Sequence, residues 1–447
     1  MNTSRMNLIV AKFGGTSMGS AEAITGVANI LKNLDCPRVA VVSAVSGITD
    51  MLIGLGALTV KQSDWREEFV RFQSRHEDII KNLDVAVDLK SFYDELERLL
   101  NGIALLQELS PSVKDHLVSF GERMSSVILA EFLKTRGIIA ERIDAKELVM
   151  TDNNYTEANV RFEETNACVE RRLRPLLDKG IVPVLTGFIG KSAEGKYATL
   201  GRGGPDYSGA IIAAALGAQE LHIWTDVDGI YSSDPRVIKG ATVIEKLSFD
   251  EAAELAYFGA KVLHPKTIHP AIKEGIPVRV LNTFRPTAKG TLIVDEESRE
   301  LKSVTWRKGV TVVNICSTRM LGPYGFLAKI FDLFAQHHVA IDVLATSEVS
   351  VSLTIDSEPP QILLDQLSEF STVTVEPHFA IVCLVGGGIK DMKDVLGRLF
   401  TAVSAYPVKM VSQGASKRNI TFLVEESVVA EVGKKVFHEF FNSPEHV

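Results

Sequence analysis

The chain opens with a short apolar run, a glycine turn, an amphipathic stretch and a second apolar run. Residues Leu8 to Ala11 and Val39 to Val42 are typical of buried strands, and the run from Ala21 to Leu34 has helical spacing. Further strand-like runs follow at Ile181 to Thr186 and Leu221 to Trp224, separated by helix-like stretches. This order predicts βαβ units in an α/β domain with an open, mainly parallel sheet sandwiched by helices.

Residues 62–109 interrupt this pattern. They are rich in charge, lack proline and carry Leu, Ile and Phe at helical spacing. We therefore expect a helical insertion at 62–109 within a first domain that spans residues 1–296. Ligands of such sheets bind beyond the carboxyl ends of the strands, which is where the glycine turns of this chain fall.

From about residue 310 the pattern changes, and one order of elements occurs twice. The sequence predicts a strand, a helix and two further strands in each copy, so we expect two tandem βαββ units at 308–376 and 377–447. Residues 357–376 are expected to connect them. The predicted elements are 310–316, 326–336, 340–345 and 349–355, then 379–385, 392–403, 408–413 and 419–424.

Composition narrows the class of protein. The 447 residues are 46% hydrophobic and 23% charged, with a formal net charge of −8, as in an ordinary globular protein of several domains. Basic residues are not clustered, which argues against nucleic acid as a partner. The chain shows neither a secretory signal nor an apolar run near the roughly 20 residues that span a bilayer. We expect a cytoplasmic protein with no membrane partner.

The four cysteines do not form a metal site. Cys36, Cys168, Cys316 and Cys383 are scattered, without a CxxC or Cys/His set at metal-ligand spacing. We expect buried free thiols and no metal ligands from the protein.

Two glycine-rich turns stand at predicted strand ends. The first, Lys12 to Ser17, precedes a helix, so the backbone N–H groups of Gly14 and Gly15 are placed to approach phosphate oxygens. Lys12 would neutralise the transferred group. The lysine precedes the glycines, so this is not a Walker loop. An ordinary tight turn remains the alternative for this motif alone.

The second glycine turn, Gly201 to Asp206, leads into a helix-like run. Arg202 presents a planar fork suited to a substrate carboxylate, and Asp206 would pair with an ammonium group or orient a lysine. A simple helix cap is the alternative for Asp206. Pro205 fits the first turn of a helix, where its missing N–H costs nothing.

Three further motifs are weak when taken alone. Residues Ser43 to Thr49 are either ligand contacts just past a strand or a serine-rich turn. Glu122 lies in an apolar helical run, as either a site carboxylate or a solvated acid at a helix start. Residues Trp224 to Tyr231, followed by Asp234 to Arg236, indicate a turn that clasps a nucleotide or an ordinary Asp-Gly turn.

Taken together, the motifs resemble those of the aspartokinase family, in the same order and over nearly the whole chain. The resemblance implies an amino-acid-kinase-like catalytic domain at 1–296. The paired βαββ units resemble the ACT domains of this family, so they are expected to be ACT-like and ferredoxin-like. The segments Met320 to Leu327 and Ile341 to Val349 resemble the effector site of its lysine-sensitive, single-function class. The catalytic motifs are Lys12 to Ser17, Ser43 to Thr49, Gly121 to Ser125, Gly201 to Asp206, Trp224 to Arg236 and Phe258 to Pro265.

The resemblance implies a role for each matching residue. The implied catalytic residues are Lys12, Arg202 and Asp206. Those near ATP are Lys12, Gly14, Gly15, Thr225, Asp226, Tyr231, Arg236, Lys261 and Val262. Those near aspartate are Ser43, Thr49, Glu122, Arg202, Gly203 and Gly204. Those near the effector lysine are Met320, Phe326, Leu327, Ala340, Ile341, Asp342, Ser347 and Glu348. The family usually has serine at the position of Pro205, so one hydroxyl and one N–H are missing there.

The implied reaction is ATP-dependent phosphorylation of the β-carboxylate of L-aspartate, with Mg²⁺ as cofactor. This is the first step toward lysine, threonine, methionine and diaminopimelate, with feedback inhibition by free lysine. The attacking carboxylate is already ionised at neutral pH, so no general base is required. The site must instead align the substrate carboxylate with the phosphates of ATP, and it must neutralise the negative charge that develops on the transferred phosphoryl group.

Several alternatives stay open from the sequence. A kinase of this fold that acts on another amino-acid carboxylate is one, and a non-enzymatic amino-acid sensor is another. The ACT-like units are expected to form a homodimer, with a higher oligomer open. A plain dimerisation module is the alternative to an effector site.

Overall fold

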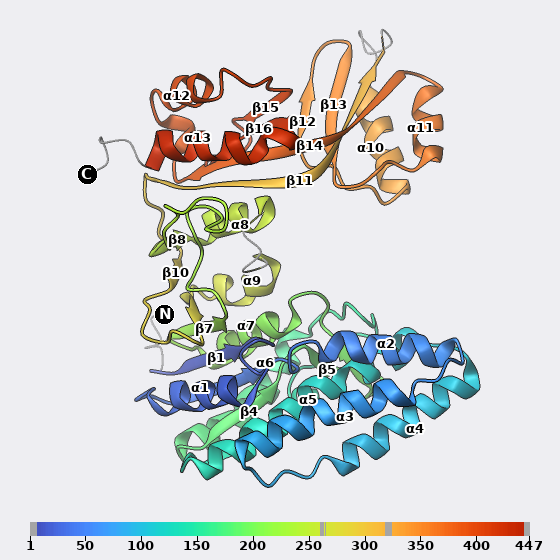
Figure 1. The fold of residues 1–447 in the computed structure, drawn as a ribbon, viewed down its shortest axis with the longest axis vertical. Coiled ribbons are helices and arrows are strands. Elements are labelled where there is room, and N and C mark those ends of the chain that lie inside the picture. The colour runs from blue at the N-terminus through green and yellow to red at the C-terminus, as the bar shows by residue number, and fades with distance from the viewer. Residues whose placement is uncertain (1–6, 260–262, 264, 318–323, 442–447) are drawn as a thin grey trace. The chain divides into compact units, whose positions relative to one another are not determined.

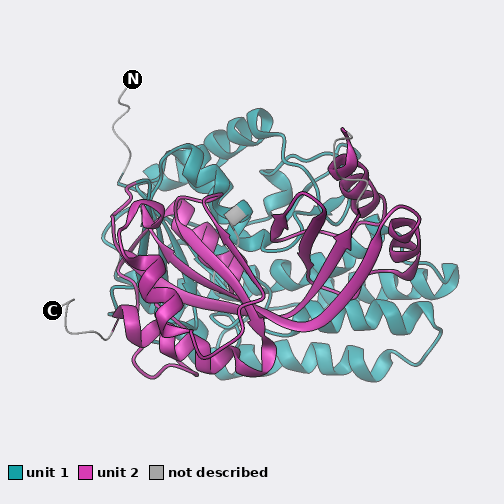
Figure 2. Cartoon of the chain, turned by 90° about the horizontal axis from the view of Figure 1, so that it is seen from above, with its two compact units in different colours: residues 1–230, 262–295 teal, residues 231–261, 296–447 magenta. Residues whose placement is uncertain are grey.

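The computed structural model describes residues 7–259, 263, 265–317 and 324–441. The chain divides into two compact units (Figure 2). The first holds Met1–Ile230 and Val262–Asp295, and the second holds Tyr231–Lys261 and Glu296–Val447. The sequence analysis expected residues 231–261 within the first domain, 1–296. The division into compact units instead assigns them to the second unit.

The first unit is built on a mainly parallel sheet, as predicted. Its strands run in the order β3, β4, β2, β1, β7, β9 and β10, and only β10 is antiparallel to its neighbour β9. Nearly every position of β1, β2 and β4 is buried, which is typical of parallel strands covered on both faces. The strands are β1 (Ile9–Phe13), β2 (Arg38–Val42), β3 (Ala140–Ile143), β4 (Val182–Thr186), β7 (Glu220–Thr225), β9 (Val278–Asn282) and β10 (Thr291–Val294).

Helices cover both faces of this sheet (Figure 1). Helix α5 (Pro111–Thr135) contacts β2, β3 and β4 on one face, and α7 (Gly204–Leu216) contacts β1, β2 and β7 on the other. Two further helices occupy the stretch 62–109 and pack with α2 against α5 and α1. The remaining elements are α1 (Ala21–Lys32), α2 (Ile48–Val60), α3 (Arg66–Leu83), α4 (Lys90–Leu106), α6 (Phe162–Asp178), α9 (Pro265–Lys273) and a hairpin of β5 (Ile189–Lys191) and β6 (Tyr197–Thr199).

The second unit contains an antiparallel sheet in the order β12, β13, β11, β14, β16 and β15. Its long central strands, β11 (Leu301–Cys316) and β14 (Thr372–Gly386), pair with each other along their length. Strand β11 contributes Val313 to the core of the first half and Val304 to the core of the second. The other elements are β8 (Lys246–Ser248), α8 (Phe249–Phe258), α10 (Phe326–Gln336), β12 (Leu344–Thr346), β13 (Ser350–Ile355), β15 (Met410–Gln413) and β16 (Asn419–Glu425).

Each half of this sheet carries one more helix than the sequence suggested, so the repeated order is βαββα. Helix α11 (Gln361–Ser368) lies in the stretch expected to be a connector, and α13 (Val429–Phe441) follows the last predicted strand. Helix α11 is short and buries only Leu363 and Leu367, which is a weak periodic signal. Helix α12 (Val395–Ala402) is likewise shorter than the predicted 392–403.

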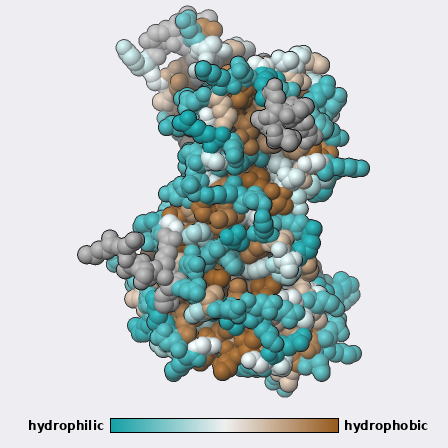
Figure 3. Space-filling view, turned by 90° about the vertical axis from the view of Figure 1, so that its left-hand side faces the viewer, coloured by the Kyte–Doolittle hydropathy of each residue, from teal (hydrophilic) through white to brown (hydrophobic). Residues whose placement is uncertain are grey.

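On the face drawn in Figure 3, hydrophilic residues alternate with apolar ones. No helix in the described ranges is long and apolar enough to cross a bilayer. The four cysteines are free thiols, but only Cys383 is buried, so the expectation of buried thiols was wrong for Cys36, Cys168 and Cys316.

Candidate active site

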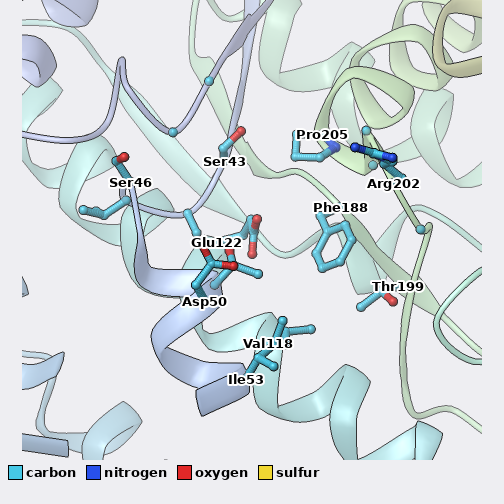
Figure 4. A pocket seen from close by; sticks show the side chains of 18 of the residues that line it. Ser43, Ser46, Asp50, Ile53, Val118, Glu122, Phe188, Thr199, Arg202 and Pro205 are labelled. Atoms are coloured by element: carbon cyan, nitrogen blue, oxygen red, sulfur yellow. The ribbon is translucent and has the colours of Figure 1, made fainter. Parts of the chain in front are cut away.

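A cavity of about 810 Å³ opens where β1, β2 and β7 end (Figure 4). Its lining comes from the turns that follow these strands, from α5 and from the turn that begins α7. Lys12 and Arg202 therefore face the same space. The cavity also gathers the predicted residues Gly14, Gly15, Ser43, Thr49, Glu122, Gly203, Gly204, Thr225 and Asp226.

Lys12 is the most buried cation of this cavity. The sequence analysis placed Lys12 in the turn after the strand, but β1 continues to Phe13, so Lys12 lies inside the strand. The residue is 8% exposed. Its Nζ forms a 2.6 Å ion pair with Oδ1 of Asp206 in the first turn of α7. The absence of a side chain at Gly209 lets α7 lie against this strand, because an added Cβ would sit 3.3 Å from Cβ of Lys12. The pair fixes the ammonium group at the cavity wall.

The first glycine turn offers other phosphate donors than its sequence suggested. The Gly14 N–H donates to the carbonyl of Trp224 at 3.0 Å, so it is already used within the sheet edge. The N–H groups of Gly15, Thr16 and Ser17 donate to no other residue in the described part of the chain. These three amides are left for a bound anion.

The second glycine turn presents Arg202 to solvent. Gly201 and Gly203 adopt φ values of 77° and 72°, a left-handed region that favours glycine. Arg202 is exposed and forms no ion pair with any described residue. Its guanidinium is therefore available to a carboxylate. Helix α7 begins directly after this turn with Pro205 in its first turn, as predicted.

Glu122 is a buried carboxylate in the middle of α5, so the alternative of a solvated acid at a helix start was wrong. Burial raises its pKa to about 8, although the backbone N–H of Ala44 and the nearby Lys12 favour the charged form. Its Oε2 accepts no hydrogen bond from the described residues. A buried, incompletely satisfied carboxylate at a cavity wall is suited to receive a cationic group.

Sequence reasoning missed several residues of the cavity, among them Asp115, Phe188 and Thr199. Phe188 has a φ of 69°, and its ring packs where a side chain on Gly204 would lie, since its Cδ2 would clash with a Cβ placed there. No local pattern marks it. Asp115 had a signal: with Ser119 and Glu122 it forms a polar stripe at spacings of 4 and 3 on a largely apolar helix.

The residues expected around ATP are divided between the units. Thr225 and Asp226 line the cavity at the end of β7, and the hydroxyl of Thr225 donates to Asp226 at 3.1 Å. Tyr231 and Arg236 belong to the second unit, where Arg236 is paired with Asp234 at 2.9 Å. The predicted residues Lys261 and Val262 lie outside the described residues.

The expected effector residues fall on three segments of the second unit. Phe326 and Leu327 begin α10, the stretch from Ala340 through Ile341 to Asp342 follows that helix, and Ser347 and Glu348 form the β12–β13 turn. Met320 lies outside the described residues.

Asp342 already has partners in the chain. Its side chain is 3% exposed and pairs with Arg307 at 2.6 Å. It also accepts a short hydrogen bond from the hydroxyl of Tyr257 in α8. Any cationic ligand of Asp342 would therefore compete with these two donors.

Comparison with known proteins identifies the class. The model of the amino acid kinase family matches residues 7–282, and a model of the ACT domain matches residues 382–440. The chain is thus an amino acid kinase joined to an ACT region.

The relatives narrow this class further. Aspartokinase 1, chloroplastic, of Arabidopsis thaliana is 39% identical over 97% of this chain and 80% of its own length. Lysine-sensitive aspartokinase 3 of Escherichia coli is 36% identical over 97% of this chain and 99% of its own. The crystal structure of E. coli aspartokinase III with aspartate and ADP superposes with a TM-score of 0.82 at 34% identity, covering 97% of this chain and 100% of that one. The chain belongs to the aspartokinase family.

Proposed function

We propose that this protein transfers the γ-phosphoryl group of ATP to the β-carboxylate of L-aspartate, giving 4-phospho-L-aspartate and ADP. The observation that carries the proposal is the shared cavity, in which Lys12, Glu122 and Arg202 surround a space bounded by two glycine turns. Membership of the aspartokinase family supports it, as does the aspartate and ADP bound to the E. coli relative.

The charges of the cavity suit a zwitterionic amino acid. In our proposal the exposed guanidinium of Arg202 holds the α-carboxylate, and Glu122 receives the α-ammonium. Thr49, Ser43 and the Gly203 to Gly204 backbone complete the substrate site. The β-carboxylate is thereby directed toward Lys12.

Charge neutralisation is the main work of the phosphoryl transfer. An oxygen of the β-carboxylate forms a bond to the γ-phosphorus while the bond from that phosphorus to the β-phosphate oxygen breaks, and ADP leaves with the electron pair. Lys12 and the free amides of the first glycine turn offset the charge that develops on the transferred group. Asp206 acts on this step by orienting Lys12.

On the nucleotide side we propose Thr225, Asp226, Tyr231, Arg236, Lys261 and Val262 as ATP contacts. Mg²⁺ is usually held by phosphate oxygens, waters and one or two carboxylates. Within the described ranges no group of three or more His, Cys, Asp or Glu side chains is arranged to hold a metal ion. This arrangement fits an ion that enters with the nucleotide, and the ion would add positive charge at the phosphates.

For regulation we propose that free lysine binds the second unit through Met320, Phe326, Leu327, Ala340, Ile341, Asp342, Ser347 and Glu348. A relative that is named for its lysine sensitivity supports this assignment. In our proposal two copies pair through their ACT-like units. We further propose a catalytic domain at 1–296, ACT-like units at 308–376 and 377–447, and a cytoplasmic location.

An ADP-release assay tests the reaction. Purified protein is supplied with ATP, Mg²⁺ and either aspartate, glutamate or no acceptor. Release that requires aspartate supports the proposal, release with glutamate alone indicates another acceptor, and no release above background with either indicates a sensor. Repeating the assay with lysine, threonine and methionine separately identifies the effector.

A further inference from the structure

Besides Glu122, helix α5 carries two buried polar side chains that bond to cavity loops. Asp115 is 1% exposed and Ser125 is fully buried. Burying a carboxylate or a hydroxyl is costly unless its hydrogen bonds are supplied. Their partners therefore indicate what these side chains stabilise.

Asp115 binds the approach to the Arg202 turn. Its Oδ2 accepts hydrogen bonds from the backbone N–H of Thr199 at 2.8 Å and of Thr156 at 2.9 Å, and its Oδ1 accepts from the Thr199 hydroxyl at 2.7 Å. It forms no ion pair with any described residue. Hydrogen bonds to an ionised acceptor are stronger than neutral ones. Thr199 ends β6, just ahead of the turn, so this anchor fixes where the turn that carries Arg202 begins.

Ser125 binds the opposite loop. Its hydroxyl donates to the carbonyl of Ser43 at 2.5 Å. The neighbouring Ala44 lies directly on the helix, because a side chain on Gly121 would place its Cβ 2.6 Å from Cβ of Ala44. The Ala44 N–H also bonds to Glu122. The loop that follows β2 is thus held on α5 by hydrogen bonds at Ser43 and Ala44 and by the close packing of Ala44 on Gly121.

The two anchors are ten residues apart on one helix, or about 15 Å along its axis at 1.5 Å per residue. Glu122 lies between them. We infer that Asp115 and Ser125 are positioning residues, which hold the two sides of the aspartate site at a fixed separation on α5. This inference rests on the proposed function, since it assigns Arg202 and the Ser43 loop to aspartate.

Steady-state kinetics of single variants test the inference, with KM measured separately for aspartate and ATP. We expect Asp115→Ala to raise the KM for aspartate at least tenfold and Ser125→Ala about threefold, with the KM for ATP within twofold. Asp115→Asn should restore the KM to within about threefold of wild type, because the amide oxygen still accepts both N–H groups and its NH₂ can donate to Thr199. A merely structural carboxylate would not separate the two KM values.

Ser126→Ala is the matched control. Ser126 is buried beside Ser125, but its hydroxyl donates to the carbonyl of Arg123 within the helix at 2.8 Å. It also accepts a hydrogen bond from Nε of Arg142 in β3 at 3.3 Å, and it contacts neither loop. The inference is overturned if Ser126→Ala raises the KM for aspartate as much as Ser125→Ala, or if both KM values rise together in Asp115→Ala.

Hydrogen exchange separates this inference from the proposed function. In the ligand-free protein the amides of Thr156 and Thr199 should exchange faster in Asp115→Ala than in Asp115→Asn or wild type. If wild type releases no ADP with aspartate, the proposed function fails while this difference still supports the anchor. Equal exchange in all three proteins would refute the anchor itself.

Discussion

Lys12 and Asp206 form a 2.6 Å ion pair that joins the central strand β1 to the first turn of α7. The side chains are only 10% and 15% exposed, so each charge depends on the other for compensation. The pair therefore serves both the fold and the proposed chemistry, and the two contributions can be separated by substitution.

Replacing Lys12 should remove activity and part of the stability. For Lys12→Met we expect kcat to fall by at least about 100-fold, which corresponds to roughly 3 kcal/mol of transition-state stabilisation. The free energy of unfolding should fall by up to about 3 kcal/mol, because Asp206 remains as an uncompensated charge. In Lys12→Met/Asp206→Asn, stability should recover while activity does not. Turnover of Lys12→Met within threefold of wild type would contradict the role of Lys12.

Glu122 should make aspartate affinity depend on pH. Its pKa of about 8, raised by burial, means that the free enzyme holds a proton there at neutral pH. Because the substrate ammonium needs the carboxylate form, the KM for aspartate should fall by up to about tenfold per unit from pH 6 toward pH 8 and then level off. A KM that is flat over this range would remove Glu122 as the ammonium ligand.

The same group should destabilise the ligand-free protein as pH rises. The folded state retains a proton that the unfolded chain loses near its ordinary pKa of 4.5, so stability should fall by about 1.4 kcal/mol per unit between that value and about pH 8. Glu122→Gln should lose this slope and become the more stable protein at pH 8, while binding aspartate poorly. Urea unfolding of both proteins at pH 6 and pH 8 measures the difference.

Gly121 and Gly102 provide a matched pair of helical glycines. A Cβ on Gly121 would sit 2.6 Å from Cβ of Ala44, whereas one on Gly102 meets nothing within 4 Å. Gly102→Ala should stabilise by about 0.5–1 kcal/mol through helix propensity. Gly121→Ala should destabilise by roughly 1–3 kcal/mol and raise the KM for aspartate, because the Ser43 loop must shift. Thermal unfolding combined with kinetics distinguishes them, and equal effects would contradict the close seating of this loop.

Pro205 leaves the substrate side of α7 short of donors. Pro205→Ser restores one N–H and one hydroxyl at a residue that lines the cavity. We expect the KM for aspartate to fall two- to fivefold, on the order of one hydrogen bond, with kcat within twofold. An unchanged KM would show that this position does not contact the substrate.

Tyr257 should set the sensitivity to lysine. The hydroxyl of Tyr257 donates a hydrogen bond to Oδ1 of Asp342, so an effector ammonium group that binds this oxygen must displace the hydroxyl. Tyr257→Phe should therefore lower the half-inhibiting lysine concentration about threefold or more without changing basal turnover, and Asp342→Asn should raise it more than tenfold. Tyr406→Phe, elsewhere in the second unit, is the control. Unchanged inhibition in Asp342→Asn would contradict the effector assignment.

The sequence predicted those parts of the fold whose pattern is local. Strands β1, β2 and β4 are nearly continuous apolar runs, as buried parallel strands are, and the sequence predicted them. Strand β7 was predicted from its shorter run at 221–224, which only His222 interrupts. Strand β3 (Ala140–Ile143) carries Glu141 and Arg142 at the sheet edge, so it lacks that signal. Helix α11 is short and is defined largely by packing on β14, which no local window contains. Helix α13 does carry a local signal, because its buried residues Val429, Val432 and Val436 recur at helical spacing, and the sequence analysis missed it.

The residues of the candidate site also fall into those that a local pattern reveals and those that only the fold brings together. Glycine turns and the Glu122 motif are visible in sequence because they are contiguous. The contacts of Asp115 with Thr199, and the ring of Phe188 over Gly204, join residues that only the fold brings together. Likewise, the chain gives no sign that the Gly14 N–H is already used by Trp224.

Strand β11 forms part of the sheet in both halves of the second unit. Its amino end pairs with the later part of β14, and its carboxyl end lies between β13 and the beginning of β14. Cleavage or truncation in the region of residue 376 would consequently not release two intact modules, since each would keep half of a ladder whose complement left with the other. Because β11 contributes residues to both cores, a shift of this strand along its axis in one half also displaces its residues in the core of the other half.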